Sequence, residues 1–482
     1  MGREIIYQKF IIHPVGQGFF YSAAVKLSEH NKFRLVFDCG SNNGRNCEDE
    51  IDQFRNEEHL PAEGLDVLVI SHFDADHVNH IKDLLDGSVK VDKLIMPFIL
   101  FEERLFLALK TLAEDDSIDD DDTPEDVNSS RLSTLSFILD PAGTLSANME
   151  GGEIILIESG SNEPPVDNES GGSTPAPEGK LAFDFDSHYK QELSNDEEQS
   201  VAIKSDGVTV KKITADHHAY LSAGIKIMEF IFYRRDIAGD EKTFYANVLT
   251  EFCKHFGIDE TLEKSVLHSA IKEKALNISS AGQIKAIFRK AKKGLKLSAD
   301  GRDIVDLNTT ALCMLHRNLP AIKPTEEPLH RYPRISLVSV SKPQGTQNNI
   351  KKYEYYDRHP YRFLWKWALH LHRFPNVLLT SDSFLLDTQE VDSFYKKYKH
   401  YWSDFWMFQI PHHGAERNSN KNLMARLSNC QPTFINYGIN NKDDHPNEHV
   451  IHDLTACGLS ANYFAINEFN GLEFTYQLFE TT

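Results

Sequence analysis

Short apolar runs separated by turn-forming residues characterise residues 1–100. The runs at 9–27 and 32–40 flank glycine turns, while 65–71 and 91–98 are nearly continuous in apolar side chains, so we expect strands in all four. Between the last two runs, 77–85 has the spacing of a helix. Strands that alternate with helices predict an α/β layered domain.

Strand-like runs return in the C-terminal part of the chain. They lie at 309–317, 334–341 and 374–383, and again within 405–418 and 432–454. We therefore expect one α/β domain formed by 1–100 and 303–482, with 101–302 as an insertion.

The insertion has a different character from its surroundings. Residues 114–126 hold nine carboxylates without a Lys or Arg, and 158–179 are rich in Gly, Pro and Ser, which predicts flexible acidic loops. Residues 239–297 predict three helices, and the last of them carries a basic patch made of Lys285, Arg289, Lys290, Lys292, Lys293 and Lys296. This patch is either a solvated helix face or a surface that contacts the phosphates of a polyanion.

The net charge and the cysteines indicate which partners and which cellular compartment fit the protein. The net charge of −21 argues against a general nucleic-acid coat, but it does not exclude nucleic acid, because much of the acid lies in two short segments. The six cysteines are scattered without a C-x-x-C pair, which favours reduced thiols and a cytoplasmic location. No run approaches the ~18 apolar residues of a membrane span, so we expect no membrane partner.

Four side chains that can bind a metal lie within six residues, directly after the run at 65–71. They are His72, Asp74, Asp76 and His77. In an extended segment the first three share one side, and His77 turns back as a helix starts. Imidazole and carboxylate together suit Zn²⁺, Mn²⁺ or Fe²⁺, and strand ends are where α/β folds bind ligands. The alternative is a polar surface turn.

Further candidates follow later apolar runs. Asp382, the pair His412 and His413, and His445 each lie where a strand-like run gives way to a loop. Taken singly, Asp382 could be a helix N-cap and the histidine pair a surface feature. Taken together, their placement predicts that they converge with the first cluster in a site for two divalent metal ions.

These motifs, in this order, resemble a known family. The segment H-x-D-x-D-H at 72–77 is similar to the signature of the metallo-β-lactamase fold. The order of VGQG, VFDCG, SHFDADH, LLTSD, PHHG and the later HP resembles the metallo-β-lactamase domain of ComEC-type competence proteins. The similarity covers 1–100 and 303–482. It implies an αββα sandwich with a large, mostly helical insertion, and two divalent ions, Zn or Mn.

The resemblance also implies roles for individual residues. His72 and Asp74 would bind one metal ion, Asp76 and His77 the second, and Asp382 would bridge the two.

In PHHG, related hydrolases place a metal-binding histidine two residues after the proline. This favours His413 as the ligand and leaves His412 beside it or facing the substrate. His445 would then be a phosphate contact or a general acid.

Two departures from the family pattern stand out. Ser381 occupies the position where glycine is usual, and no third-motif histidine is evident between His77 and Asp382. His217 and His218 could fill that gap, but they lie within the insertion, which favours a solvent-exposed pair.

The function implied is phosphodiester hydrolysis, first as a nuclease on DNA or RNA, in DNA processing or anti-phage defence. Asp76 would orient the attacking water, and His412 or His445 would protonate the departing alkoxide. Lys285, Arg289, Lys292 and Lys293 would contact a polymeric substrate. One alternative is hydrolysis of a cyclic nucleotide or another small phosphodiester or ester. A further alternative is a non-catalytic metal-binding subunit whose insertion docks a protein partner.

Overall fold

The computed structural model describes residues 5–42, 44–114, 125–145, 147–161, 180–186, 191–192, 208–237, 239–278, 280–295, 311–319, 322–324, 334–339, 376–402, 407–427, 432–439, 441–460 and 463–480. Within these residues the protein is of the α/β class, with two large mixed sheets and helices.

The first sheet follows the order β13-β19-β1-β2-β3-β4-β5-β6-β9-β8, and β14 also pairs with β19. Its strands are β1 (Ile5–Ile12), β2 (Gly18–Ser28), β3 (Asn31–Ser41), β4 (Leu65–Val69), β5 (Val91–Pro97), β6 (Glu153–Glu158), β8 (Gln191–Glu192), β9 (Thr209–Thr214), β13 (Ile322–Pro324), β14 (Arg334–Ser339) and β19 (Asn470–Glu480). The run from β3 through β4, β5 and β6 to β9 is parallel.

The second sheet follows the order β18-β17-β16-β15-β12-β11-β10-β7. Its strands are β7 (Ala182–Phe185), β10 (His218–Ser222), β11 (Lys226–Tyr233), β12 (Cys313–Asn318), β15 (Val377–Leu379), β16 (Met407–Gln409), β17 (Thr433–Asn436) and β18 (Tyr463–Ile466). The four strands from β15 to β18 are parallel.

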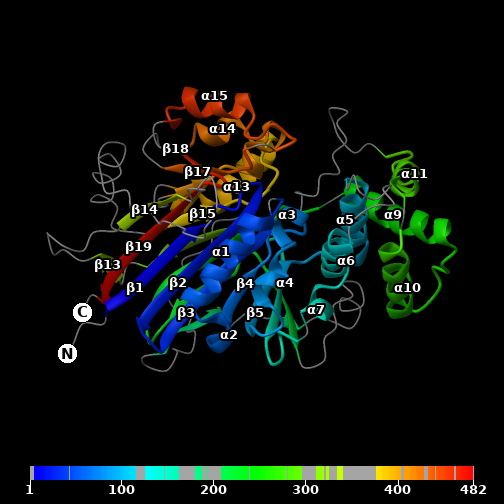
Figure 1. Cartoon of the computed structure of the whole chain (residues 1–482). Helices are drawn as coiled ribbons and strands as arrows, with labels where there is room; N and C mark the ends of the chain where they lie inside the picture. The colour runs from blue at the N-terminus through cyan, green and yellow to red at the C-terminus, as the bar shows by residue number, and fades with distance from the viewer. Residues whose placement is uncertain are drawn as a thin grey trace, which may run out of the picture.

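Helices lie on the outer faces of the sheets (Figure 1). Those before residue 300 are α1 (Gly44–Glu57), α2 (Leu60–Glu63), α3 (Ala75–Val78), α4 (Ile81–Leu85), α5 (Phe101–Glu114), α6 (Glu125–Leu139), α7 (Pro141–Thr144), α9 (Asp240–Phe256), α10 (Lys264–Leu276) and α11 (Ala281–Ala291). Those of the C-terminal part are α13 (Thr388–Tyr398), α14 (Lys421–Met424) and α15 (Glu448–Ala456), with the short 3-10 turns η4 (Lys399–Tyr401), η5 (His412–Gly414) and η6 (Glu416–Asn418).

Three buried apolar clusters set the order of the layers. One lies between the two sheets, where Phe19 stacks against Phe434 with ring centroids 6.3 Å apart. A second joins the first sheet to the helices from α1 to α11, and a third joins the second sheet to α13, α14 and α15. The layers therefore run helix, sheet, sheet, helix, because each sheet has two apolar faces to bury.

Most of the elements expected from the sequence are confirmed. The four N-terminal strand regions form β1 to β5, the later runs form β12 and β14 to β17, and 239–297 contains three helices. The helix expected at 77–85 is instead two short helices, α3 and α4, with a turn at Asn79 and His80 between them.

Residues 101–302 were expected to form a mostly helical insertion, but they also contribute strands to both sheets. Within this range β6 and β9 extend the first sheet, and β7, β10 and β11 extend the second, because their apolar side chains fill the space between the sheets. Most of the acidic segment at 114–126, the loop at 162–179, the junction at 302–303 and Lys296 lie outside the described residues.

Among the helices of the described residues, none is both long enough and apolar enough to cross a membrane.

The loops at one edge of the two sheets are packed closely. A Cβ atom on Gly40 would come within 2.5 Å of the carbonyl carbon of His77. A Cβ atom on Gly18 would come within 2.5 Å of the backbone carbonyl oxygen of Asp76. Only glycine at these two positions lets β2 and β3 approach α3 so closely. The glycines of the VGQG and VFDCG motifs therefore shape the place where the metal-binding candidates meet.

Candidate metal centre

The candidate residues come from the carboxyl ends of strands in both sheets. His72 and Asp74 follow β4, Asp382 follows β15, and His413 follows β16. Because the strands are parallel at both places, their carboxyl ends lie at one edge and bring the two loops together.

A first group consists of His72, Asp74 and Asp382. The Nε2 atom of His72 lies 3.5 Å from Asp74 Oδ2 and 3.8 Å from Asp382 Oδ2. One ligand atom from each residue lies within 4.8 Å of the other two, so the group could hold a metal ion.

A second group consists of Asp76, His77 and His413. The Nε2 atom of His413 lies 3.3 Å from Asp76 Oδ2 and 3.7 Å from Asp382 Oδ2, and the Nε2 atom of His77 lies 3.2 Å from Asp382 Oδ1. Asp382 therefore lies between the two groups, with an oxygen near each. The structure brings His413, not His412, into the group.

The polar atoms that face this centre have no hydrogen-bond partner. The Nε2 atoms of His72, His77 and His413 and the Oδ1 atom of Asp382 are all buried and unpaired. All four side chains are at most 3% exposed. Since unpaired buried polar atoms are costly, a cation among them gives the arrangement a physical reason. Three imidazoles and three carboxylates are ligands that suit a divalent transition metal.

Behind these ligands lies a buried carboxylate that the sequence did not point to. Asp38, at the end of β3, accepts a hydrogen bond from His77 Nδ1 at 2.8 Å, from the Ser71 amide at 2.7 Å and from the Ser71 hydroxyl at 2.5 Å. These bonds show that Asp38 orients His77, and Asp38, His72 and His77 also lie close enough together to hold a metal ion. Asp38 is the aspartate of the VFDCG motif, and this motif was the feature of the sequence that could have identified it as a residue that orients a metal ligand.

The other two histidines are oriented in the same way. His413 Nδ1 donates to the carbonyl of Asn436 at 2.8 Å, and His72 Nδ1 lies 2.9 Å from the Ser71 hydroxyl. Since the Ser71 hydroxyl donates to Asp38, it accepts from His72. Each Nδ1 thus carries the hydrogen, and each Nε2 lone pair is left facing the centre.

Backbone strain concentrates at the same place. Seven residues other than glycine have a positive φ in the described part of the chain, and four of them are Asp38, Ser381, His412 and His413. Such conformations are unfavourable for residues with a Cβ atom and cluster at functional sites.

The buried carboxylates of the centre favour positive charge beside them. Burial alone would raise the pKa of Asp76, but the imidazole of His413 beside it and the charge of His77 lower it to about 2. Burial would lower the pKa of His77, yet the carboxylates of Asp382 and Asp38 raise it well above its usual value. The carboxylates therefore attract either protons on the imidazoles or a metal ion.

His412 and His445 lie beside the centre rather than in it. His412 Nδ1 is 3.9 Å from Asp382 Oδ2, and the His412 side chain is 22% exposed. The two rings are 5.6 Å apart, and the Nδ1 of His445 is buried without a partner. Burial and the nearby His412 lower the pKa of His445 to about 4.

The remaining sequence candidates lie elsewhere. Lys285, Arg289, Lys292 and Lys293 belong to α11 and the turn after it, in the outer helical layer. The expectation that His217 and His218 form a solvent-exposed pair is wrong for His218, which is 8% exposed and lies 2.5 Å from Glu229. It is buried because Glu229 and Arg317 complete a charged network around it.

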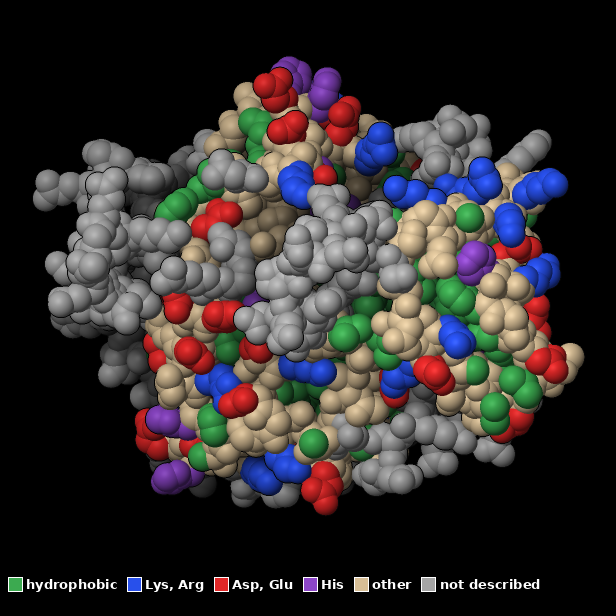
Figure 2. Space-filling model, turned by 45° about the vertical axis from the view of Figure 1, so that its right-hand side comes forward, with side chains coloured by type: hydrophobic (Ala, Val, Ile, Leu, Met, Phe, Trp, Pro, Cys, Tyr) green, Lys and Arg blue, Asp and Glu red, His purple; other side chains and the backbone are tan. Residues whose placement is uncertain are grey.

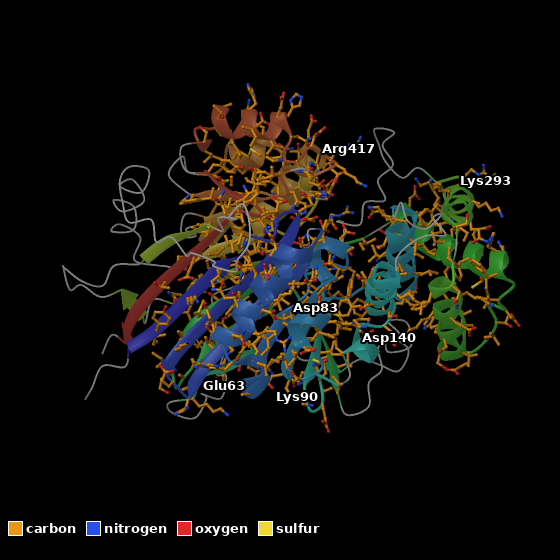
Figure 3. The ribbon with its side chains drawn as sticks, in the orientation of Figure 1. Glu63, Asp83, Lys90, Asp140, Lys293 and Arg417 are labelled. Atoms are coloured by element: carbon orange, nitrogen blue, oxygen red, sulfur yellow. The ribbon has the colours of Figure 1, made fainter. Side chains whose placement is uncertain are left out.

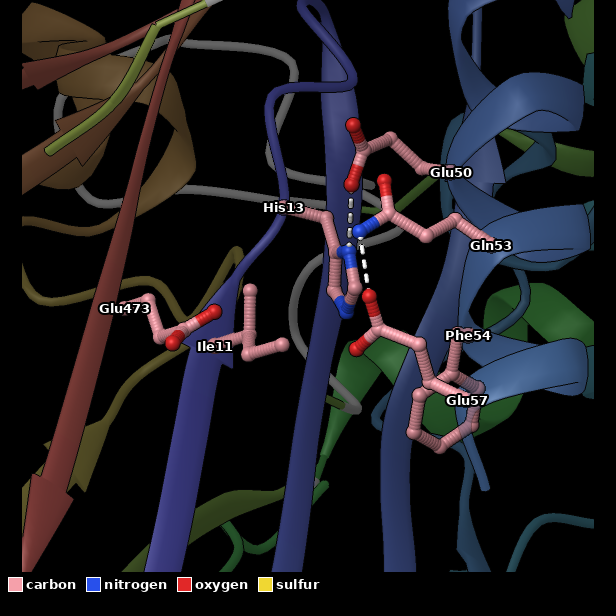
Figure 4. A pocket seen from close by; sticks show the side chains of 7 residues that line it. All are labelled: Ile11, His13, Glu50, Gln53, Phe54, Glu57 and Glu473. Atoms are coloured by element: carbon pink, nitrogen blue, oxygen red, sulfur yellow. Dashed lines mark hydrogen bonds and ion pairs between the residues drawn. The ribbon is translucent and has the colours of Figure 1, made fainter. Parts of the chain in front are cut away.

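Away from the metal centre, Ser22, His13 and Glu50 are hydrogen-bonded in the order of a Ser-His-Glu catalytic triad. His13 Nδ1 donates to Glu50 at 2.8 Å (Figure 4). Its Nε2 accepts from the Ser22 hydroxyl at 2.8 Å. Ser22 is only 2% exposed, inside β2, so no substrate can reach it. We interpret the group as a support between β1, β2 and α1.

No family model and no curated protein sequence matches the chain. The site is therefore assigned from its geometry and its residue types alone.

Proposed function

We propose that the protein is a metal-dependent phosphodiester hydrolase with a metallo-β-lactamase-like αββα fold, and that its substrate is DNA or RNA. The observation that carries this proposal is the convergence of three unpaired imidazole nitrogens and three carboxylates from both sheets. The order of the layers and the position of the site at the strand ends support the fold assignment.

Two divalent ions, Zn or Mn, bound by these residues would polarise the phosphoryl oxygens and lower the pKa of water toward ~7. His72, Asp74 and Asp382 would hold one ion, and Asp76, His77 and His413 the other, with Asp382 shared. The free carboxylate oxygen of Asp76 would orient the attacking water.

His412 and His445 would act on the other side of the phosphate. They lie next to the centre and next to each other, at the rim formed by η5 and the loop after β17. From there they would donate hydrogen bonds to the phosphoryl oxygens and to the departing oxygen.

A nuclease assay tests this proposal. Labelled single- and double-stranded DNA and RNA would be incubated with Mn²⁺, Zn²⁺, Mg²⁺ or EDTA and with the wild type, Asp76→Ala or the surface control Asp86→Ala. We expect metal-dependent cleavage that falls by at least ~10²-fold in Asp76→Ala and is unchanged in Asp86→Ala. No cleavage by protein shown to contain metal would refute the nuclease.

One observation favours a second candidate. The net charge of −21 disfavours long polyanions and suits a small substrate such as a cyclic nucleotide. If polymers are not cleaved, hydrolysis of cyclic nucleotides in the same assay would support this alternative.

A further inference from the structure

The exposed cations of α11 stand out in a strongly acidic chain. The helix buries Ala281, Ile284, Ile287 and Ala291, and its cations point to the other side. Lys285, Arg289 and Lys293 are exposed, and none of them forms an ion pair with a described residue. These three charges are therefore available to an anionic partner.

These cations form a row with a definite length. Lys285, Arg289, Lys292 and Lys293 are spaced by four, three and one residues, which places them along one side of the helix. The row extends over ~12 Å at 1.5 Å per residue. This is the length of about three or four phosphates of one strand at a rise of ~3.4 Å each.

A further cation follows the loop that supplies His413 to the metal centre. Arg417 is exposed in η6, only four residues after His413, and forms no ion pair with a residue that the structure describes. Its turn is fixed on both sides of the arginine. The Glu416 amide donates to Asn447 Oδ1 at 2.7 Å, and Asn418 Nδ2 donates to the carbonyl of Asp382 at 3.2 Å.

Both groups lie in the upper half of the molecule as Figure 1 shows it. There α3, which carries Asp76 and His77, lies just above the middle and below the C-terminal helices, and α11 lies at the upper right. Figure 3 shows Arg417 at the right-hand border of the C-terminal helices, on the side of the helical layer, and Lys293 at the top of that layer. In Figure 2, Lys and Arg side chains gather along the upper right of the surface.

We propose that Lys285, Arg289, Lys292, Lys293 and Arg417 form a basic track that binds the phosphate backbone of a polynucleotide and leads it to the metal centre. This inference rests on the proposed function and specifies its substrate as a polymer. Arg417 would contact a phosphate next to the one being cleaved, and the α11 row would contact phosphates further along the strand. A small phosphodiester would be too short to reach α11.

The test measures binding apart from cleavage. All proteins carry Asp76→Asn so that the probe stays intact, and binding of a fluorescein-labelled single-stranded oligonucleotide is followed by anisotropy as a function of salt. The track variant replaces Lys285, Arg289, Lys292 and Lys293 by Gln. The matched control removes the same number of charges from α9 and α10 by replacing Lys242, Lys254, Lys264 and Lys274 by Gln.

If the four cations each contact a phosphate, the slope of log affinity against log salt becomes shallower by up to ~2.8, at ~0.7 per contact, and affinity at about 0.1 M salt falls by ~10²–10³-fold. The control variant keeps the slope of the parent. Equal binding by the track variant and the parent would overturn the inference, as would the absence of binding by the parent.

Arg417 is tested by a second pair of variants. Arg417→Gln should reduce the slope by ~0.7 and the affinity about fivefold, and Arg417→Lys should restore most of both. Arg426→Gln is the control, because the charge of Arg426 is already paired with Asp392. An unchanged slope in Arg417→Gln would remove this residue from the track.

The outcomes separate this inference from the proposed function. If Asp76-containing protein cleaves oligonucleotides but the track variant binds normally, the hydrolase stands and the track is wrong. If no cleavage is found but the track variant loses binding, the track stands without the nuclease. Vesicles of phosphatidylserine and phosphatidylcholine provide the last comparison. Binding to them that is lost in the track variant, while oligonucleotide binding is kept, would assign the surface to a membrane and overturn the proposal.

Discussion

At the scale of single residues, Ser381 combines a strained backbone with a role in orienting ligands. Its φ is 49°, and its hydroxyl lies 2.6 Å from that of Ser71 and 3.4 Å from both His72 Nδ1 and Asp38 Oδ2. Glycine would fit this backbone better, so the serine is explained by its contacts. Together with Ser71 it connects the supports of His72 and His77.

We therefore predict that Ser381→Gly weakens metal binding while the fold is kept. Loss of a group that orients a ligand typically costs ~10–100-fold in metal affinity. The free energy of unfolding in EDTA should stay within about 1 kcal/mol of the wild type, because the relief of strain offsets the lost hydrogen bonds. Calorimetric titration with Mn²⁺ or Zn²⁺ measures the affinity. Ser383→Ala, in the same loop, is the control, and equal affinities in both variants would contradict the role.

At the scale of elements, α5 carries a buried acid that couples the helical layer to pH. Glu103 is 5% exposed, and one of its oxygens has no hydrogen-bond partner. Burial raises its pKa to about 7, against the attraction of Arg234 after β11, with the charges of Glu102 on α5 and Lys242 on α9 nearby. In the sequence, residues 101–104 (FEER) have the acidic side chains that are common in the first turn of a helix, so the burial of Glu103 could not be predicted.

The folded protein binds the Glu103 proton more tightly than the unfolded chain does, so its stability falls as the pH rises from about 4.5 to about 7. The full loss is roughly 3 kcal/mol at ~1.36 kcal/mol per pKa unit. Glu103→Gln stays neutral and should gain stability over the wild type at about pH 8 but not below pH ~4.5. Urea unfolding at both pH values measures this. Glu273→Gln, exposed on α10, should show no such change, and a gain that is independent of pH would contradict the assignment.

Local sequence patterns predict some residues of the centre and some strands, but they miss those that depend on strand pairing. His72, Asp382 and His413 were found because each follows an apolar run, and that local pattern survives in the fold. The contacts of Asp38 depend on the pairing of β3 with β4, where Phe37 faces Val69, and no local pattern specifies that register. Likewise β6 and β11 read as part of an insertion until their pairing with β5 and β12 is known.

At the scale of the whole molecule, the candidate centre joins the two sheets. His72, Asp74, Asp76 and His77 come from the first sheet, while Asp382 and His413 come from the second, about three hundred residues later in the chain. A metal ion bound by both sets would require the sheets to be packed together, so metal binding would stabilise the fold as a whole.

This coupling predicts a thermal shift that depends on the bridging carboxylate. At a free metal concentration ~100 times the dissociation constant, binding adds about 2.7 kcal/mol, which corresponds to roughly 3 °C in Tm for a chain of this length. EDTA should remove this increment from the wild type. Asp382→Ala should have the same Tm with metal and with EDTA, because the first group then lacks a member and the second loses the carboxylate oxygen that lies beside His77. The exposed Asp392→Ala should respond as the wild type does. A metal-dependent Tm that persists in Asp382→Ala would place the stabilising ion elsewhere and would separate the metal from the junction of the two sheets.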